Sequence, residues 1–263
     1  MMRTAANAVV RLLLAPACPG CSHPLDRPLD GPICEKCWLG IPRLTDPLCD
    51  LCGDPLPSTA APFRLCQRCL AEPPPFEVAR SAGLHAGPLK AIVHAFKYDQ
   101  RRPLARPLAR LMLDVGADVL AGADAVVPVP LHPWRALRRG FNQADDLAEH
   151  LGLPVWHPIR RVRHGPAQTG LNGRDRRTNV SRAFDRRRGL VVGLDRARAA
   201  RLHNRTVVLI DDVMTTGATM GACSVALLEA GAGRVRVLTV SRAPAPAPVP
   251  PPREHRLSTV PHR

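Results

Sequence analysis

The chain has 263 residues, of which 45% are hydrophobic, and it carries a formal net charge of +15. This length allows one sizeable core plus a smaller module, and no segment approaches the ~20 apolar residues of a membrane-spanning helix. Almost all of the cations are arginines, which bind phosphate through a forked pair of donors, so the charge favours a polyanionic partner. A composition rich in Ala, Arg, Pro and Gly explains the excess of positive charge equally well.

The N-terminal segment, residues 1–17, superficially resembles a secretion signal. Arg3 is followed by apolar residues, and Ala15-Pro16-Ala17 has the small-x-small pattern of a cleavage site. Arg11 interrupts the apolar run, however, and the piece after it is shorter than the roughly 7–15 residues that a signal peptide requires. We therefore expect a cytoplasmic protein.

Residues 18–72 form a cysteine-rich module that the proline run at 73–75 closes. Eight of the nine cysteines lie in four CxxC pairs, namely Cys18/Cys21, Cys34/Cys37, Cys49/Cys52 and Cys66/Cys69. Each pair offers two thiolates to a tetrahedral ion, so two pairs complete a site with four cysteine ligands and the module predicts two structural Zn²⁺ ions. The spacing favours two successive zinc ribbons, while a cross-braced pairing stays open; disulfides are the main alternative chemistry.

Residues 76–242 alternate apolar strands with helical stretches, which predicts an α/β domain with a mainly parallel sheet. We expect strands at Val78 to Gly83, Ala125 to Leu131, Pro154 to Val162, Val207 to Val213 and Arg234 to Ser241. We expect helices at Leu89 to Phe96, Pro103 to Leu120, Phe141 to Leu151 and Thr219 to Ala230. Gly152 and Gly231 follow the last two helices as C-terminal caps.

Basic side chains in three places are candidates for contact with a pyrophosphate group. Lys97 directly follows the first predicted helix. The alternative to a phosphate contact is that Lys97 is an ordinary solvent-exposed residue at the end of an amphipathic helix. The loop after the strand at 125–131 carries Arg135, Arg138 and Arg139, which a solvated basic face would also explain. The segment 168–179 contains Gln168 and Arg176 between glycines, as in a mobile lid that closes over phosphate, or as in an ordinary surface loop.

The segment 207–220, VVLIDDVMTTGATM, predicts a site for a phosphorylated ribose. Asp211 and Asp212 end a buried strand, and such paired carboxylates suit a partner with paired donors, such as the 2′ and 3′ hydroxyls of ribose, or a cation. The residues that follow are small or hydroxylated and precede a helix, so backbone N–H groups and the helix dipole can converge on one phosphate. These phosphate-loop residues are Thr215, Thr216, Gly217, Ala218 and Thr219.

The last segment, residues 243–263, is rich in proline and alanine and has too few large apolar residues for a core. We expect it to be extended and disordered.

The combined pattern resembles the ComF family of competence-associated proteins. The matching motifs are Phe96-Lys97-Tyr98, Pro128 to Pro133, Arg139 to Gln143, Gln168 with Leu171, Arg176 with Asn179, and Val207 to Thr219. The resemblance implies a type I phosphoribosyltransferase-like fold that binds phosphoribosyl pyrophosphate (PRPP). It also implies that the acidic pair Asp211 and Asp212 binds the ribose hydroxyls, that Thr215 to Thr219 bind the 5′-phosphate, and that Mg²⁺ neutralises the pyrophosphate.

Two functions from different classes fit this pattern. The first is a phosphoribosyltransferase that acts on an unidentified acceptor, which the acidic pair and the loop favour. The second is a non-catalytic accessory protein that binds DNA or a protein partner and uses the PRPP fold as a ligand-sensing or structural platform. For either function the resemblance implies an association with DNA uptake in natural transformation, with single-stranded DNA and proteins of the uptake machinery as partners. The net charge and an aromatic content of only 3%, which leaves few side chains to stack on a base, favour this second function.

Overall fold

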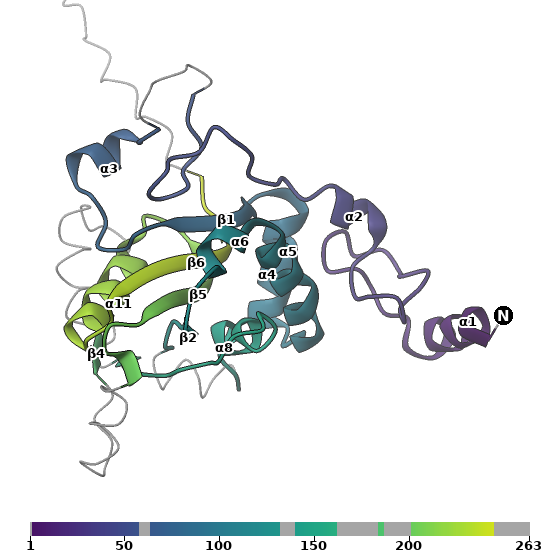
Figure 1. Ribbon diagram of the computed structural model, residues 1–263. Helices are drawn as coiled ribbons and strands as arrows, with labels where there is room; N and C mark the ends of the chain where they lie inside the picture. Colours follow the sequence, from purple (N-terminus) through teal and green to yellow (C-terminus); the bar gives the residue numbers. More distant parts are fainter. Residues whose placement is uncertain (1, 58–63, 132–139, 162–183, 187–200, 245–263) are drawn as a thin grey trace, which may run out of the picture.

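The computed structural model describes residues 2–57, 64–131, 140–161, 184–186 and 201–244. At its centre, four parallel strands form a sheet in the order β1-β6-β5-β2 (Figure 1). The strands are β1 (Ala79–Leu84), β2 (Ala125–Pro128), β5 (Thr206–Met214) and β6 (Arg234–Arg242). The runs of Val, Ile and Leu in β2, β5 and β6 are typical of parallel strands that are buried on both faces. The predicted parallel sheet is confirmed, and the carboxyl ends of its strands meet at one edge.

Helices cover both faces of this sheet (Figure 1). They are α4 (Gly87–Tyr98), the 3-10 turn η1 (Arg102–Leu104), α5 (Ala105–Val115), α6 (Ala117–Leu120), α8 (Gln143–Ala148) and α11 (Ala218–Glu229). Because side chains alternate along a strand, Val208 and Ile210 of β5 pack with α4, α5 and α8. Val207 and Leu209 face the other way and share a core with α11.

The helix expected over 103–120 is divided at Gly116. A side chain at this position would lie 2.6 Å from Leu238 Cδ2, so only glycine allows the helix to approach β6 this closely. The helix expected over 141–151 is shorter than predicted because Asn142 caps it, accepting a hydrogen bond from the Ala144 N–H at 3.3 Å. Gly231, with φ of +103°, follows the end of α11 as predicted.

The strand expected over 154–162 was only partly correct. Val155 makes a single parallel bridge to Val126, whereas β3 (Ile159–Arg161) pairs antiparallel with β4 (Phe184–Arg186) in a separate two-stranded sheet. Pro154 and Pro158 lack the N–H donors that a continuous ladder needs. The segment therefore touches the main sheet once and then leaves it.

The N-terminal part adds helix α1 (Met2–Leu14), which the sequence patterns did not predict, and one short helix in each half of the cysteine module. These are α2 (Glu35–Leu39) and α3 (Gln67–Ala71). In Figure 1, α1 and α2 lie to one side of the sheet, while α3 lies beside the sheet end that carries α11. Among the described residues, no helix combines the length and apolar composition that a bilayer span requires.

Candidate ligand and metal sites

The acidic pair lies at the carboxyl end of β5, as the sequence predicted. The Asp212 side chain is only 8% exposed, and its Oδ1 lies 2.9 Å from Lys97 Nζ. Lys97 is in the last turn of α4, so the packing of α4 on the sheet brings together two motifs that are 115 positions apart in the chain. A buried carboxylate of this kind requires a paired cation, and Lys97 supplies it.

Asp211 sits beside this ion pair in a different electrostatic environment. Its Oδ1 accepts a hydrogen bond from the Asp212 backbone N–H at 2.9 Å. Burial, together with the negative charge of Asp212, raises the pKa of Asp211 well above its ordinary range, and the charge of Lys97 opposes this shift only in part. A ligand that donates hydrogen bonds or positive charge to Asp211 would lower this pKa and favour the carboxylate form.

The loop after β5 turns sharply into the N-terminus of α11. Gly217 is the N-cap, with φ of +80°, and a side chain there would lie 3.0 Å from Met214 Cε. Thr216 Oγ1 accepts a hydrogen bond from the Ala218 N–H at 3.4 Å. The other backbone N–H groups of the first turn point out of the N-terminal end of α11, which is also the positive end of the helix dipole. The structure thus places residues 215–219 together in one turn, at the N-terminus of α11 and next to the acidic pair.

Two further side chains, which the sequence analysis missed as site residues, fix the geometry around this pair. Buried Gln143 donates from Nε2 to the Lys97 carbonyl at 3.3 Å, so this side chain holds the end of α4 in place. His85 follows β1, and its Nδ1 lies 3.0 Å from Ser241 Oγ, which in turn donates to the Asp212 carbonyl at 3.2 Å. Burial and the nearby charge of Lys97 lower the pKa of His85. Its position directly after a strand, at the edge where ligands bind, was the available signal.

The other basic candidates lie outside the described residues. Arg135, Arg138 and Arg139 fall within 132–139, and Gln168 and Arg176 fall within 162–183. Lys97 is therefore the basic candidate that the structure brings to the acidic pair.

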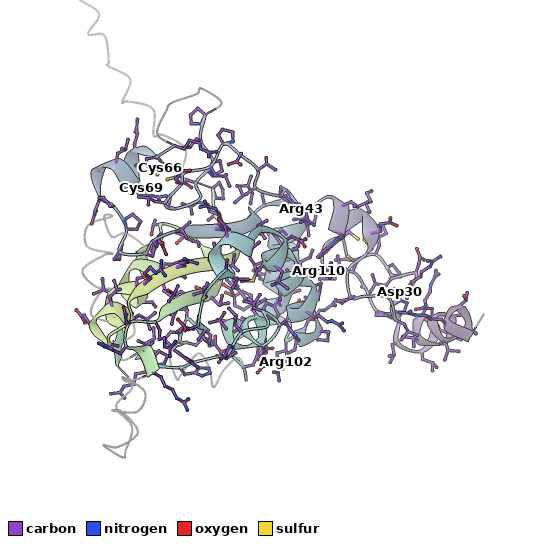
Figure 2. The ribbon with its side chains drawn as sticks, in the orientation of Figure 1. Asp30, Arg43, Cys66, Cys69, Arg102 and Arg110 are labelled. Atoms are coloured by element: carbon purple, nitrogen blue, oxygen red, sulfur yellow. The ribbon has the colours of Figure 1, made fainter. Side chains whose placement is uncertain are left out.

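The eight CxxC cysteines form two compact groups. One contains Cys18, Cys21, Cys34 and Cys37 and the other contains Cys49, Cys52, Cys66 and Cys69, and within each group the sulfur atoms lie within 4.8 Å of one another. The pairs are thus used in succession, which resolves the choice that spacing left open in favour of two successive ribbons. None of the chain's nine cysteines is in a disulfide. Figure 2 labels Cys66 and Cys69 of the second group beside α3.

The geometry and chemistry of both groups fit zinc. A tetrahedral ion with Zn–S bonds of about 2.3 Å separates its sulfur ligands by about 3.8 Å, and the Cys21–Cys34 and Cys52–Cys66 sulfur separations are 3.8 and 3.6 Å. Burial and neighbouring sulfurs raise the pKa of Cys69, so without a metal the four thiols of a group do not all ionise together. Each group uses all four tetrahedral positions, which is typical of structural zinc.

Comparisons with known proteins agree with both parts of the chain. Residues 9–72 match the family described as double zinc ribbon domain, and residues 136–256 match the phosphoribosyl transferase domain. Competence protein F of Haemophilus influenzae is 32% identical over 76% of this chain and 85% of its own length. DNA utilization protein YhgH of Salmonella typhimurium is 36% identical over 77% of this chain and 87% of its own length.

A more distant relative and a solved structure also match the chain. Competence protein ComFC of Bacillus subtilis is 27% identical over 77% of this chain and 80% of its own length. The solved structure of the allosteric regulatory enzyme of purine biosynthesis is 23% identical over 51% of this chain and 25% of that chain, with a TM-score of 0.32 that supports no conclusion about function. With its double zinc ribbon, its type I phosphoribosyltransferase-like domain and relatives above 30% identity along most of their length, the chain belongs to the ComF family of competence-associated proteins.

Proposed function

We propose that the protein binds PRPP together with Mg²⁺ at the carboxyl edge of the sheet. The observation that carries the proposal is the meeting of the acidic pair, a half-buried Asp211 and a buried Asp212, with the glycine-capped N-terminus of α11 on one strand-turn-helix unit. Carboxylates accept hydrogen bonds and helix N-termini bind anions, so the unit matches both ends of a phosphorylated ribose.

Each part of the site has a distinct role in this proposal. Asp211 and Asp212 accept hydrogen bonds from the ribose hydroxyls, and Thr215 to Thr219 hold the 5′-phosphate through backbone N–H groups and hydroxyls. Mg²⁺ neutralises the pyrophosphate. Lys97 pairs with Asp212 and holds its side chain in place before the ligand arrives. We also assign the pyrophosphate contacts to the loop and lid candidates of the sequence analysis, which are four arginines and one glutamine, namely Arg135, Arg138, Arg139, Gln168 and Arg176.

Phosphoribosyl transfer is the reaction that such a complex supports. A bond forms between the anomeric carbon and the acceptor while the bond to pyrophosphate breaks, and the electron pair leaves with the pyrophosphate. Catalysis then depends on positioning and on stabilising the departing negative charge. A screen of acceptors for Mg²⁺-dependent release of pyrophosphate, with water as the reference acceptor, tests this step separately from binding.

Calorimetric titration with PRPP and Mg²⁺ tests the binding step. Replacing the acidic pair, Asp211→Asn with Asp212→Asn, should abolish the binding heat, because the amides no longer provide two charged acceptors. Asp145→Asn is the matched control, since Asp145 pairs with His157 at 2.8 Å on α8 and has no part in the proposed site. If the double variant binds as tightly as the unmodified protein, the assignment of the acidic pair is wrong.

DNA binding is a second candidate function, favoured by the net charge of +15 and by relatives that are named for competence and DNA utilization. Under this proposal the arginines bind the phosphates of single-stranded DNA in support of uptake. Fluorescence anisotropy with a labelled single-stranded oligonucleotide should then give a log–log salt slope of about −0.7 per phosphate contacted. Absence of binding at low salt would refute it.

A further inference from the structure

The two cysteine groups differ in their surroundings, although each matches the same ligand geometry. In both groups backbone N–H groups donate to a sulfur at 3.4 Å, from Cys34 to Cys18 Sγ and from Cys66 to Cys49 Sγ. The cysteines of the first group form a small core of their own, whereas the sulfurs of the second group belong to the core between the sheet and α11. Only the second group, within the part of the chain that the structure describes, has arginine side chains at a sulfur.

Arg242 is the main cation at this second group. It is the last residue of β6 and is only 1% exposed. Its Nη2 lies 3.6 Å from Cys52 Sγ, its Nη1 donates to the Cys52 carbonyl at 2.7 Å, and its Nε forms an ion pair with Asp54. A fully buried guanidinium is costly unless every donor direction is used. Here the ribbon itself supplies the partners.

Arg68 completes the charge arrangement from the ribbon side. Its Nη2 lies 2.5 Å from Asp54 Oδ2 and 4.0 Å from Cys52 Sγ, and its side chain is 39% exposed. Four thiolates around Zn²⁺ carry a net charge of −2, so Arg242 and Arg68 are placed to offset that charge. Hydrogen bonds and charges around the ligands of a metal tune its retention.

The same guanidinium also contacts the start of the phosphate loop. Arg242 Nη1 lies 3.5 Å from Met214 Sδ, and Met214 is the register partner of Arg242 between β5 and β6. Met214 Cε in turn is the nearest atom to the position that a side chain on Gly217 would occupy, at 3.0 Å. A continuous series of contacts therefore runs from Cys52 through Arg242 and Met214 to Gly217.

A cavity of about 380 Å³ lies alongside this series. Its lining includes Cys52 and Arg68 from the ribbon and Thr216 and Gly217 from the loop. Because of this cavity, the loop is not closely packed on this side. We therefore expect its conformation to depend more strongly on the contacts with Arg242 and Met214.

We propose that Arg242 is a positioning residue that retains zinc at the second ribbon and makes that zinc site a structural support of the phosphate loop. The first zinc site has no such link. Coupling of this kind is reciprocal: loss of the second zinc loosens the loop, and loosening of the loop weakens retention of the second zinc. This property of the ribbon is independent of which ligand the loop binds.

Zinc retention is measured on the full chain loaded with two zinc ions, by adding a chelator and following N-ethylmaleimide labelling of each cysteine by mass spectrometry. The two ribbons then act as internal references for each other. Arg242→Met should speed labelling of the second group by about 10-fold or more and leave the first group unchanged. Arg242→Lys, which retains the charge, should restore part of the difference. Arg205→Met is the matched control because Arg205 pairs with Asp124 at 2.7 Å and touches no cysteine.

Equal acceleration of both groups in Arg242→Met, or no acceleration of the second group in a folded variant, would overturn the assignment. If Arg242→Met does not fold, Arg68→Met gives the same test from a more exposed position, and unchanged labelling of the second group would then count against the proposal. Support of the loop is read by hydrogen exchange of the amides of residues 215–220. Cys66→Ser should speed this exchange and Cys21→Ser should not; equal exchange in the two variants would disprove the link.

Discussion

Replacing Gly217 with alanine should separate the conformational role of this residue from its role in ligand binding. At φ of +80° an alanine is strained by about 1–2 kcal/mol, and the lower entropy of the unfolded alanine chain offsets part of this cost. A net loss of about 1 kcal/mol in the free energy of unfolding corresponds to a Tm lower by about 2–4 °C. The added methyl also meets Met214 Cε at 3.0 Å, and under the proposed function it stands where the phosphate would approach. We therefore expect the affinity for PRPP to fall by at least about tenfold, or 1.4 kcal/mol.

The control for this experiment is Gly152→Ala. Gly152 has a similar φ of +74°, and a side chain there meets nothing within 4 Å. Differential scanning calorimetry should show a similar loss of stability in both variants, and isothermal titration with PRPP and Mg²⁺ should show weakened binding only in Gly217→Ala. The reasoning would be refuted if Gly217→Ala lost stability as Gly152→Ala does and still bound PRPP with unchanged affinity.

Three further results are expected. The pKa of Asp211 in the folded chain lies above the ordinary carboxyl value of 3.8, so the folded state binds more protons than the unfolded state and the free energy of unfolding falls as pH rises from 3.8 toward the raised pKa. Asp211→Asn should remove this pH dependence of the Tm in thermal unfolding curves, and an unchanged pH dependence would contradict the reasoning. Lys97→Met leaves the Asp212 carboxylate buried without its cation, so it should lower the free energy of unfolding by about 3–5 kcal/mol, and a denaturant titration that finds less than about 1 kcal/mol would show that the pair is dispensable. Cys66→Ser should lower the Tm of the protein more than Cys21→Ser, because the cysteines of the second group lie in a core of the sheet whereas those of the first group lie in a small core of their own. Equal Tm values would oppose this.

Local chemistry made the strand-turn-helix unit at 206–229 predictable from the sequence. A buried apolar run ends in Asp211 and Asp212, and a glycine with positive φ then begins the helix, so every signal lies within a few residues. That the module holds two sites with four cysteine ligands was predictable for the same reason, since each CxxC pair offers two sulfurs to one ion. Spacing alone did not decide which pairs combine, because that depends on how the chain folds back between them.

Features that depend on contacts between distant segments were not predictable. Nothing near Lys97 indicates that it pairs with Asp212, because the contact is created by the packing of α4 on the sheet. The break at Gly116 depends on Leu238 in the neighbouring strand. The burial of Arg242 against Cys52 likewise arises only when the core is assembled. From the sequence alone, an arginine at the end of a strand is expected to be a solvent-exposed charge.

Hydrogen exchange measured with and without PRPP and Mg²⁺ tests the central claim most directly, because it locates the ligand on the backbone. The account predicts slower exchange of the amides at 216–220, where the first turn of α11 would hold the 5′-phosphate. The same protection should disappear when Asp211 and Asp212 are both replaced by asparagine. Unchanged exchange at 216–220 at saturating PRPP and Mg²⁺, or protection confined to the zinc ribbons, would contradict the account.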